Sequence, residues 1–182
     1  NGRGLGRQGL GKRGGKPIED ALENALEWLA RHQSPDGSWD SDGFDAECGA
    51  TGNTICDGPG RAGHDVGVTG LVLLAFLGEG GVPGEGRYGD VLSKGIFWLR
   101  GQQDPDTGLL GDASTHEYLY NHAIGSLALC EAYYASNSPR LKRPAQSAIH
   151  YINRARNPYS AWRYDSPPVG TNDTSVTGWM IF

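Results

Sequence analysis

A recurring pattern of helix, glutamine, turn and tryptophan constrains this chain more than any other feature. Its first copy, residues 25–39, reads ALEWLARHQSPDGSW: an apolar helical pattern runs up to Gln33, breaks at Pro-Asp-Gly and resumes at Trp39. Proline disfavours helical geometry in the residue before it, and Asp-Gly is typical of turns. The same arrangement returns in residues 94–110 and, with more substitutions, in residues 147–162. Each copy therefore predicts the end of a helix followed by a tight turn.

A second motif opens the helices that follow these turns. The segments DVGVTGL, NHAIGSL and DTSVTGW begin at Asp65, Asn121 and Asp173. The two motifs alternate, so the unit is a helical hairpin of about fifty residues used three times, and such a period is typical of stacked repeats. The pattern predicts helices over residues 17–33, 65–77, 90–103, 121–133 and 141–156, and one more from residue 173.

The two helices of each hairpin differ in polarity. The first helix is amphipathic, whereas the second is apolar nearly all round and contains small residues such as Gly67, Gly70 and Gly125. We therefore expect an all-α fold in which amphipathic helices form an outer layer and apolar helices form a buried inner layer. Trp28, Trp98 and Tyr151 occupy one repeat position, which places them in the core.

The ends of the chain differ from its middle. Residues 1–16 are rich in glycine and basic residues without hydrophobic periodicity, which predicts a flexible linker. Residues 17–182 are the expected partial repeat domain. Because the chain starts without Met and stops inside an apolar run, we expect it to be a truncated piece of a longer protein. The net charge of −5 favours no nucleic-acid partner, and no apolar run approaches the ~20 residues of a transmembrane segment.

The first motif resembles the QW repeat of the terpenoid cyclases, in which an aromatic and an aliphatic residue precede Gln and Gly-x-Trp. Gln33, Trp39, Gln103 and Trp162 match it, whereas Leu110 replaces Trp in the second copy and Arg156 replaces Gln in the third. The whole chain resembles the prenyltransferase/squalene-oxidase-repeat proteins of planctomycete bacteria. The resemblance implies an arc of an α/α toroid, with parallel inner helices inside an outer ring. We expect the Gln side chain to bind backbone groups freed at the helix end.

The resemblance does not extend to the acid that starts cyclase chemistry. Those enzymes protonate an alkene with the middle Asp of an acidic motif, and Asn172 stands at that position here. An amide has no proton of useful acidity, and Asp173 is the expected N-cap of its helix. A cyclase that uses this segment is therefore disfavoured, although catalytic residues in missing repeats stay open.

Parallel inner helices would gather their N-termini at one end of the fold. That arrangement predicts a candidate ligand-binding site at the inner-helix mouth, formed by His64, Asp65, Asn121, His122 and Asp173. Such a site could hold an anion or a metal, or carry out acid–base chemistry. The alternative is that the residues that open the helices are caps alone, which explains their shared repeat position.

The remaining candidates are two cysteines in the long polar segment 40–63. Cys48 and Cys56 would close a short loop as a disulfide, which favours an extracytoplasmic compartment. A zinc site with His64 and an acidic residue is an alternative, although the spacing fits no common structural zinc pattern. Two reduced thiols are the third interpretation. Our main prediction is that the chain binds no cofactor and no metal.

These observations favour a non-catalytic binding or structural repeat domain of an extracytoplasmic bacterial protein. Its ligand or protein partner would contact the concave inner face, and an exposed apolar inner face could also self-associate. The alternative function is a fragment of a cyclase-like or lyase-like toroid enzyme acting on an apolar or polymeric substrate in the central cavity.

Overall fold

The computed structural model describes residues 15–51, 56–58, 60–158, 161–167 and 170–182. The described chain is all-α, as the sequence predicts, and its β-structure is limited to isolated bridges. Most of the predicted linker, residues 1–14, lies outside the described residues. The elements are α2 (Lys16–Arg31), η1 (Phe44–Thr51), α3 (Asp65–Gly78), α4 (Gly89–Gly101), α5 (Tyr118–Ser136), α6 (Pro139–Arg154) and α7 (Thr174–Ile181).

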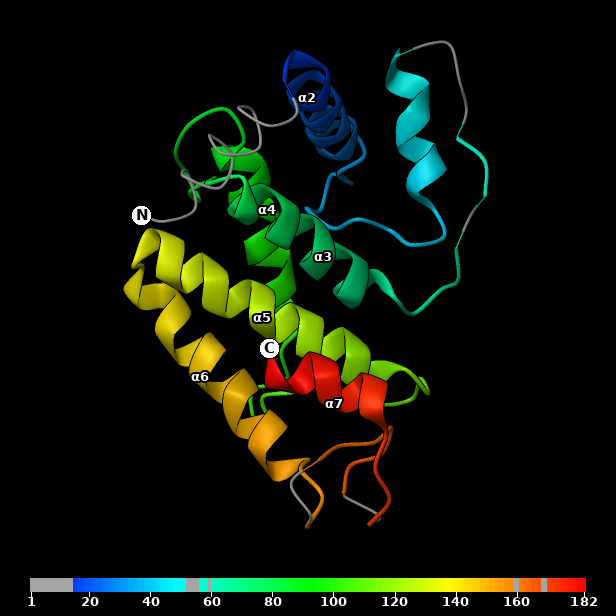
Figure 1. The fold of residues 1–182 in the computed structure, drawn as a ribbon, viewed down its shortest axis with the longest axis vertical. Coiled ribbons are helices and arrows are strands. Elements are labelled where there is room, and N and C mark those ends of the chain that lie inside the picture. Colours follow the sequence, from blue (N-terminus) through cyan, green and yellow to red (C-terminus); the bar gives the residue numbers. More distant parts are fainter. Residues whose placement is uncertain (1–14, 52–55, 59, 159–160, 168–169) are drawn as a thin grey trace.

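The helices alternate between two layers. Helix α5 packs chiefly against α3 and α6, and it also contacts α7 and α4. Figure 1 shows α3, α5 and α7 side by side and running in the same direction, with α2, α4 and α6 outside this row. The arrangement is compatible with stacked helical hairpins, in which the apolar helices form the inner layer.

Local sequence explains where the helices begin and end. Pro17 lies in the first turn of α2, where the missing N–H costs nothing, and Glu19 faces the positive end of the helix. Pro139 opens α6 in the same way. Helix α5 ends where Asn137 adopts the left-handed conformation, with φ 50°. Asparagine tolerates this conformation better than most residues, and it often terminates helices.

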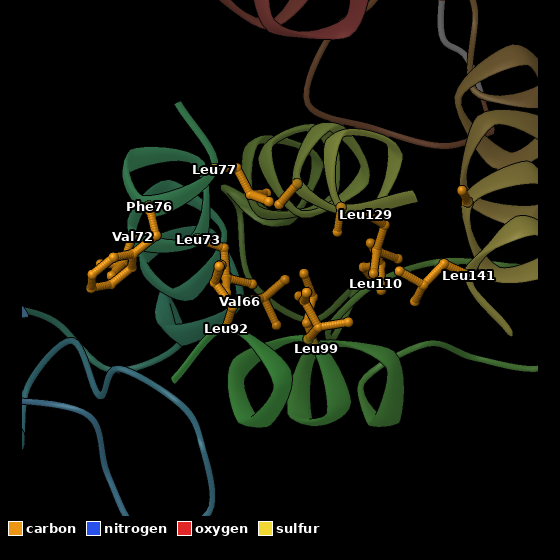
Figure 2. Packing of buried hydrophobic residues seen from close by; sticks show 14 of the residues in the cluster. Val66, Val72, Leu73, Phe76, Leu77, Leu92, Leu99, Leu110, Leu129 and Leu141 are labelled. Atoms are coloured by element: carbon orange, nitrogen blue, oxygen red, sulfur yellow. The ribbon is translucent and has the colours of Figure 1, made fainter. Parts of the chain in front are cut away.

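The main core lies between α3, α5 and α4 (Figure 2). Leu73, Leu92, Leu99, Leu110 and Leu129 are fully buried there. A second cluster joins α5 and α6 to α7, and it includes Leu119, Ile152, Trp162, Val176 and Met180. Helix α5 therefore contributes to both clusters, which is why it needs apolar residues on more than one face.

Three details differ from the sequence-based expectations. Trp28 is 38% exposed instead of lying in the core, because it sits at the C-terminal end of α2 against the loop. Leu71 of α3 is 46% exposed, so this inner helix is not covered on all sides. The polar segment after Trp39 contains the 3₁₀ helix η1. No helix in the described ranges has the length and apolarity needed to cross a bilayer.

Two turn glycines bring each turn against the outer helix that follows it. Gly37 has a φ of 101°, and a Cβ atom there would lie 2.5 Å from the backbone oxygen of Lys94 in α4. Gly108 has a φ of 82°, and its Cβ would lie 2.4 Å from the backbone oxygen of Ser147 in α6. Glycine is required at both positions, since the backbone angle and the close approach exclude a side chain.

Replacing Gly37 with alanine should destabilise the fold by about 2–4 kcal/mol, because the new Cβ adds a backbone clash to the cost of the positive φ. Gly80→Ala is the matched control: Gly80 has a φ of 98°, and nothing lies within 4 Å of its Cβ position. We expect Gly80→Ala to cost about 1–2 kcal/mol. Urea denaturation measures both values, and equal losses would contradict the close contact at Gly37.

Candidate functional site

The two motif glutamines occupy equivalent places and make equivalent contacts. The Nε2 group of Gln33 donates to the backbone oxygen of Gly37 in its own turn, at 3.0 Å, and to that of Val91 in α4, at 2.9 Å. Gln103 donates to the oxygens of Gly108, at 3.2 Å, and of Pro144 in α6, at 3.0 Å. Each glutamine therefore links its turn to the outer helix of the next hairpin.

The tryptophans, and not the glutamines, bind the carbonyl groups at the helix ends. The indole Nε1–H of Trp39 donates to the backbone oxygen of Leu29 at 2.7 Å, and that of Trp162 donates to Ile152 at 2.8 Å. Carbonyl groups in the last turn of a helix have fewer intrahelical partners than those of the interior. The indole of Trp39 is a second donor to the Leu29 oxygen, which also accepts from the N–H of His32 at 3.2 Å. The expectation that Gln would bind the freed helix end was therefore wrong, because its amide reaches across to the next helix.

A further hydrogen bond connects each turn to its inner helix. The backbone N–H of Trp39 donates to Thr69 Oγ1 at 2.9 Å, and that of Trp162 donates to Thr177 Oγ1 at 3.0 Å. The N–H of Leu110 instead donates to His122 Nδ1 at 3.0 Å. Gly125 stands where the other inner helices have these threonines, and His122 lies one turn earlier in α5. The imidazole thus supplies the acceptor that this copy of the motif lacks.

His122 is completely buried and serves the core. Its Nε2–H donates to the backbone oxygen of Ala148 in α6 at 3.2 Å. Its ring packs edge-on against that of Tyr151, with 4.7 Å between the ring centroids. These bonds place the proton on Nε2 and leave Nδ1 as the acceptor. Burial lowers the pKa of His122 to about 4, so the ring is neutral at physiological pH. A neutral, enclosed imidazole cannot exchange protons with a substrate.

The other residues of the inner-helix mouth also have structural partners. Asp65 accepts from the backbone N–H and the hydroxyl of Ser41, at 2.9 and 2.7 Å. Asn121 donates to the backbone oxygen of Gly63 at 2.9 Å. His64 precedes α3 and is half-buried, and its backbone oxygen accepts from Val68.

In the C-terminal part of the predicted mouth, the side chain of Asp173 also forms hydrogen bonds with the backbone. Asp173 caps α7 by accepting from the N–H groups of Ser175 and Val176, at 2.9 and 3.0 Å. The Ser175 hydroxyl and the Val176 N–H hold the pKa of Asp173 below its ordinary value. Asn172, at the position of the cyclase acid, accepts from Asn157 Nδ2 at 2.9 Å. The side chains of Asp65, Asn121, His122 and Asp173 therefore bind backbone or serine groups and not one another.

A hollow of about 480 Å³ does lie at this end of the fold, but it uses other residues. Its side chains include those of Asp65, Trp98, Gln103, Asp104 and Asp112. Of the five predicted mouth residues, Asp65 alone lines it. His122 is enclosed in the core and His64 does not line this hollow, so neither predicted histidine faces it.

A cluster that sequence reasoning missed lies where the long loop meets α2. The Nε2 atom of His32 is 3.3 Å from Cys48 Sγ and 3.5 Å from Cys56 Sγ. The structure holds the two cysteines as thiols and not as the predicted disulfide, which stays a prediction for the oxidised chain. His64, the histidine of the alternative zinc site considered from sequence, is not among these three residues. Hydrogen bonding to Cys48 raises the pKa of the Cys56 thiol, with a smaller contribution from burial.

The sequence contained one signal for this cluster. His32 stands at the repeat position that Gln102 and Ala155 occupy in the other copies, so the hairpin itself does not require a histidine there. The first copy is also the one with the long cysteine-containing loop. Comparison of the chain with protein-family models, curated proteins and solved structures finds no match.

The burial of His122 predicts a pH-dependent loss of stability. Its pKa falls from 6.5 in the unfolded chain to about 4 in the folded protein, so the unfolded state binds the proton first as the pH decreases. The free energy of unfolding should fall by on the order of 3 kcal/mol from pH 6.5 to pH 4. Below pH 4, His122 is protonated in both the folded and the unfolded state, so it should cause no further change in stability.

Urea denaturation across this pH range measures the effect. His122→Asn keeps an acceptor for the Leu110 N–H but cannot titrate, so the slope between pH 6.5 and 4 should flatten. His150→Asn, at an exposed position of α6, is the control and should keep the slope of the unmodified chain. An unchanged slope in His122→Asn would show that another group is responsible.

Proposed function

We propose that this chain is a non-catalytic binding or structural domain built from α/α hairpins, a segment of a toroid of the QW-repeat type. The observation that carries the proposal is that four of the five polar side chains at the inner-helix mouth form hydrogen bonds with groups of the fold itself. Asp65 accepts from Ser41, Asn121 donates to Gly63 and His122 joins α5 to α6, whereas Asp173 caps its own helix. A scaffold needs such joints, whereas a catalytic site needs side chains that face a substrate.

The three turns support the repeat interpretation. The N–H of the residue after the motif glutamine position donates across each turn, from Ser34 to Ser38, from Asp104 to Leu109 and from Asn157 to Ala161. Their distances are 2.9, 2.8 and 2.8 Å. The residue that follows each acceptor then binds an inner-helix side chain. One hydrogen-bond arrangement thus recurs at corresponding positions, as expected of stacked copies of one unit.

The proposed binding surface is the inner row, defined by Leu71, Leu127 and Trp179. These residues stand at corresponding positions of α3, α5 and α7, six residues after Asp65, Asn121 and Asp173 respectively. Leu71 is 46% exposed, and Leu127 and Trp179 are half-buried. An apolar row on adjacent parallel helices suits an apolar ligand or the apolar face of a protein partner.

The fluorescent dye 8-anilinonaphthalene-1-sulfonate provides a probe for this surface. We expect the native chain to bind the dye, and we expect the double variant Leu71→Gln, Leu127→Gln to bind it about tenfold more weakly, because apolar area is lost from the inner row. The measurement is dye fluorescence as a function of protein concentration, with circular dichroism to verify that the variant is folded.

Phe97→Gln is the matched control, because Phe97 is 74% exposed on the outer helix α4. It removes an accessible aromatic group without altering the inner row, so dye binding should persist. Equal loss in both variants, or unchanged binding in the double variant, would contradict a binding surface at the inner row.

A further inference from the structure

We propose that His32, Cys48 and Cys56 form a zinc site, in which His32 Nε2 and the two Sγ atoms coordinate one Zn²⁺. The three atoms lie within 4.8 Å of one another. They come from the end of α2, from η1 and from the segment after it, so the site brings together parts of the chain that are distant in sequence. The proposal does not depend on the function of the inner row.

The two distances from His32 Nε2 to the sulfur atoms are close to those of a tetrahedral zinc site. Zn–S bonds of about 2.3 Å and Zn–N bonds of about 2.0–2.1 Å, at a tetrahedral angle, separate sulfur from nitrogen by about 3.6 Å. The observed separations from His32 Nε2 are 3.3 Å to Cys48 and 3.5 Å to Cys56. Small movements of the side chains would therefore be enough to accept the ion.

The histidine is already oriented as a metal ligand. Its Nδ1–H donates to the backbone oxygen of Trp28 at 2.7 Å, which leaves the lone pair of Nε2 facing the two sulfurs. Zinc-bound histidines usually donate their other ring N–H in this way, because the second bond fixes the tautomer and the ring orientation. The indole of Trp28 stacks on the imidazole, with 3.9 Å between ring centroids, and this packing restricts the ring further.

The environment suits a neutral metal–thiolate group. His32 and Cys48 are 6% and 5% exposed, and Phe44 packs near the rings of Trp28 and His32. Cys56 is half-buried, and two thiolates balance the charge of Zn²⁺, so a site of this composition carries no net charge. The backbone N–H of Cys56 also lies 3.3 Å from Cys48 Sγ and could donate to the thiolate.

The donor set indicates which metal would bind. Thiolate ligands with imidazole select zinc over magnesium or calcium, which prefer oxygen ligands. Binding forms two Zn–S bonds and one Zn–N bond and releases the two thiol protons to solvent, with no change in oxidation state. Three protein ligands leave the fourth tetrahedral position to water. The ion would fasten Cys48 of η1 and Cys56 to the end of α2.

The test uses the full chain, reduced and stripped of metal with a chelator, and titrated first with Co²⁺ and then with Zn²⁺. We expect one equivalent of Co²⁺ to produce the thiolate charge-transfer band and the intense visible bands of tetrahedral cobalt, and Zn²⁺ to abolish both. His32→Ala, Cys48→Ser and Cys56→Ser should each weaken Zn²⁺ binding by at least about 100-fold.

Two controls distinguish this site from other donors in the chain. Cys130→Ser removes the third cysteine, and His64→Asn removes the histidine nearest the end of the loop, so both should keep the spectrum and the affinity. Absence of the tetrahedral cobalt spectrum from the reduced, unmodified chain would overturn the proposal, even if a ligand variant fails to fold. If the reduced Cys56→Ser variant is folded and binds Zn²⁺ with the affinity of the unmodified chain, the proposal is overturned as well.

Discussion

The arrangement of the helices depends on the contact between each turn and the outer helix of the next hairpin. Gly37 and Gly108 let the turn backbone approach the oxygens of Lys94 and Ser147, which lie at corresponding positions of α4 and α6. The amide groups of Gln33 and Gln103 then bridge the same two elements. Because the approach is close and the bridge is short, the separation of turn and helix is nearly the same in both places.

The inner layer is held to this frame by a second bond, and the three copies form it with different side chains. Thr69 and Thr177 accept the N–H that follows the turn, whereas His122 does so in the middle copy. A histidine is larger than a threonine, and it starts one helical turn earlier, next to Gly125. It also reaches Ala148, so the same ring binds a turn and an outer helix. This double use explains a buried histidine without any catalytic role.

The fold was largely predictable from sequence, because helix ends and apolar periodicity are local properties. The Pro-Asp-Gly turn after Gln33 and the apolar run after Asp65 gave the hairpins, and the structure confirms an all-α chain. The candidate sites could not be predicted in the same way, because they depend on distances between segments that are far apart in the sequence. His122 was expected at an open mouth, yet it lies in the core, where it accepts from the Leu110 N–H because Gly125 has no side chain to do so. His32 approaches Cys48 only after the long loop folds back onto α2, which no local pattern describes.

The glutamine bridge ends on main-chain oxygens, and this choice of acceptor affects how the sequence can diverge. Gln33 binds the oxygen of Val91 and Gln103 binds that of Pro144. Every residue type carries this oxygen, even proline, whose own nitrogen cannot donate. The outer-helix residue whose backbone oxygen accepts from the glutamine can therefore be substituted without loss of this hydrogen bond. A joint of this kind tolerates substitutions in the helix that supplies the oxygen, whereas it depends on the glutamine in the first two copies. Neighbouring outer helices can therefore acquire unrelated surfaces while the spacing between turn and helix stays the same.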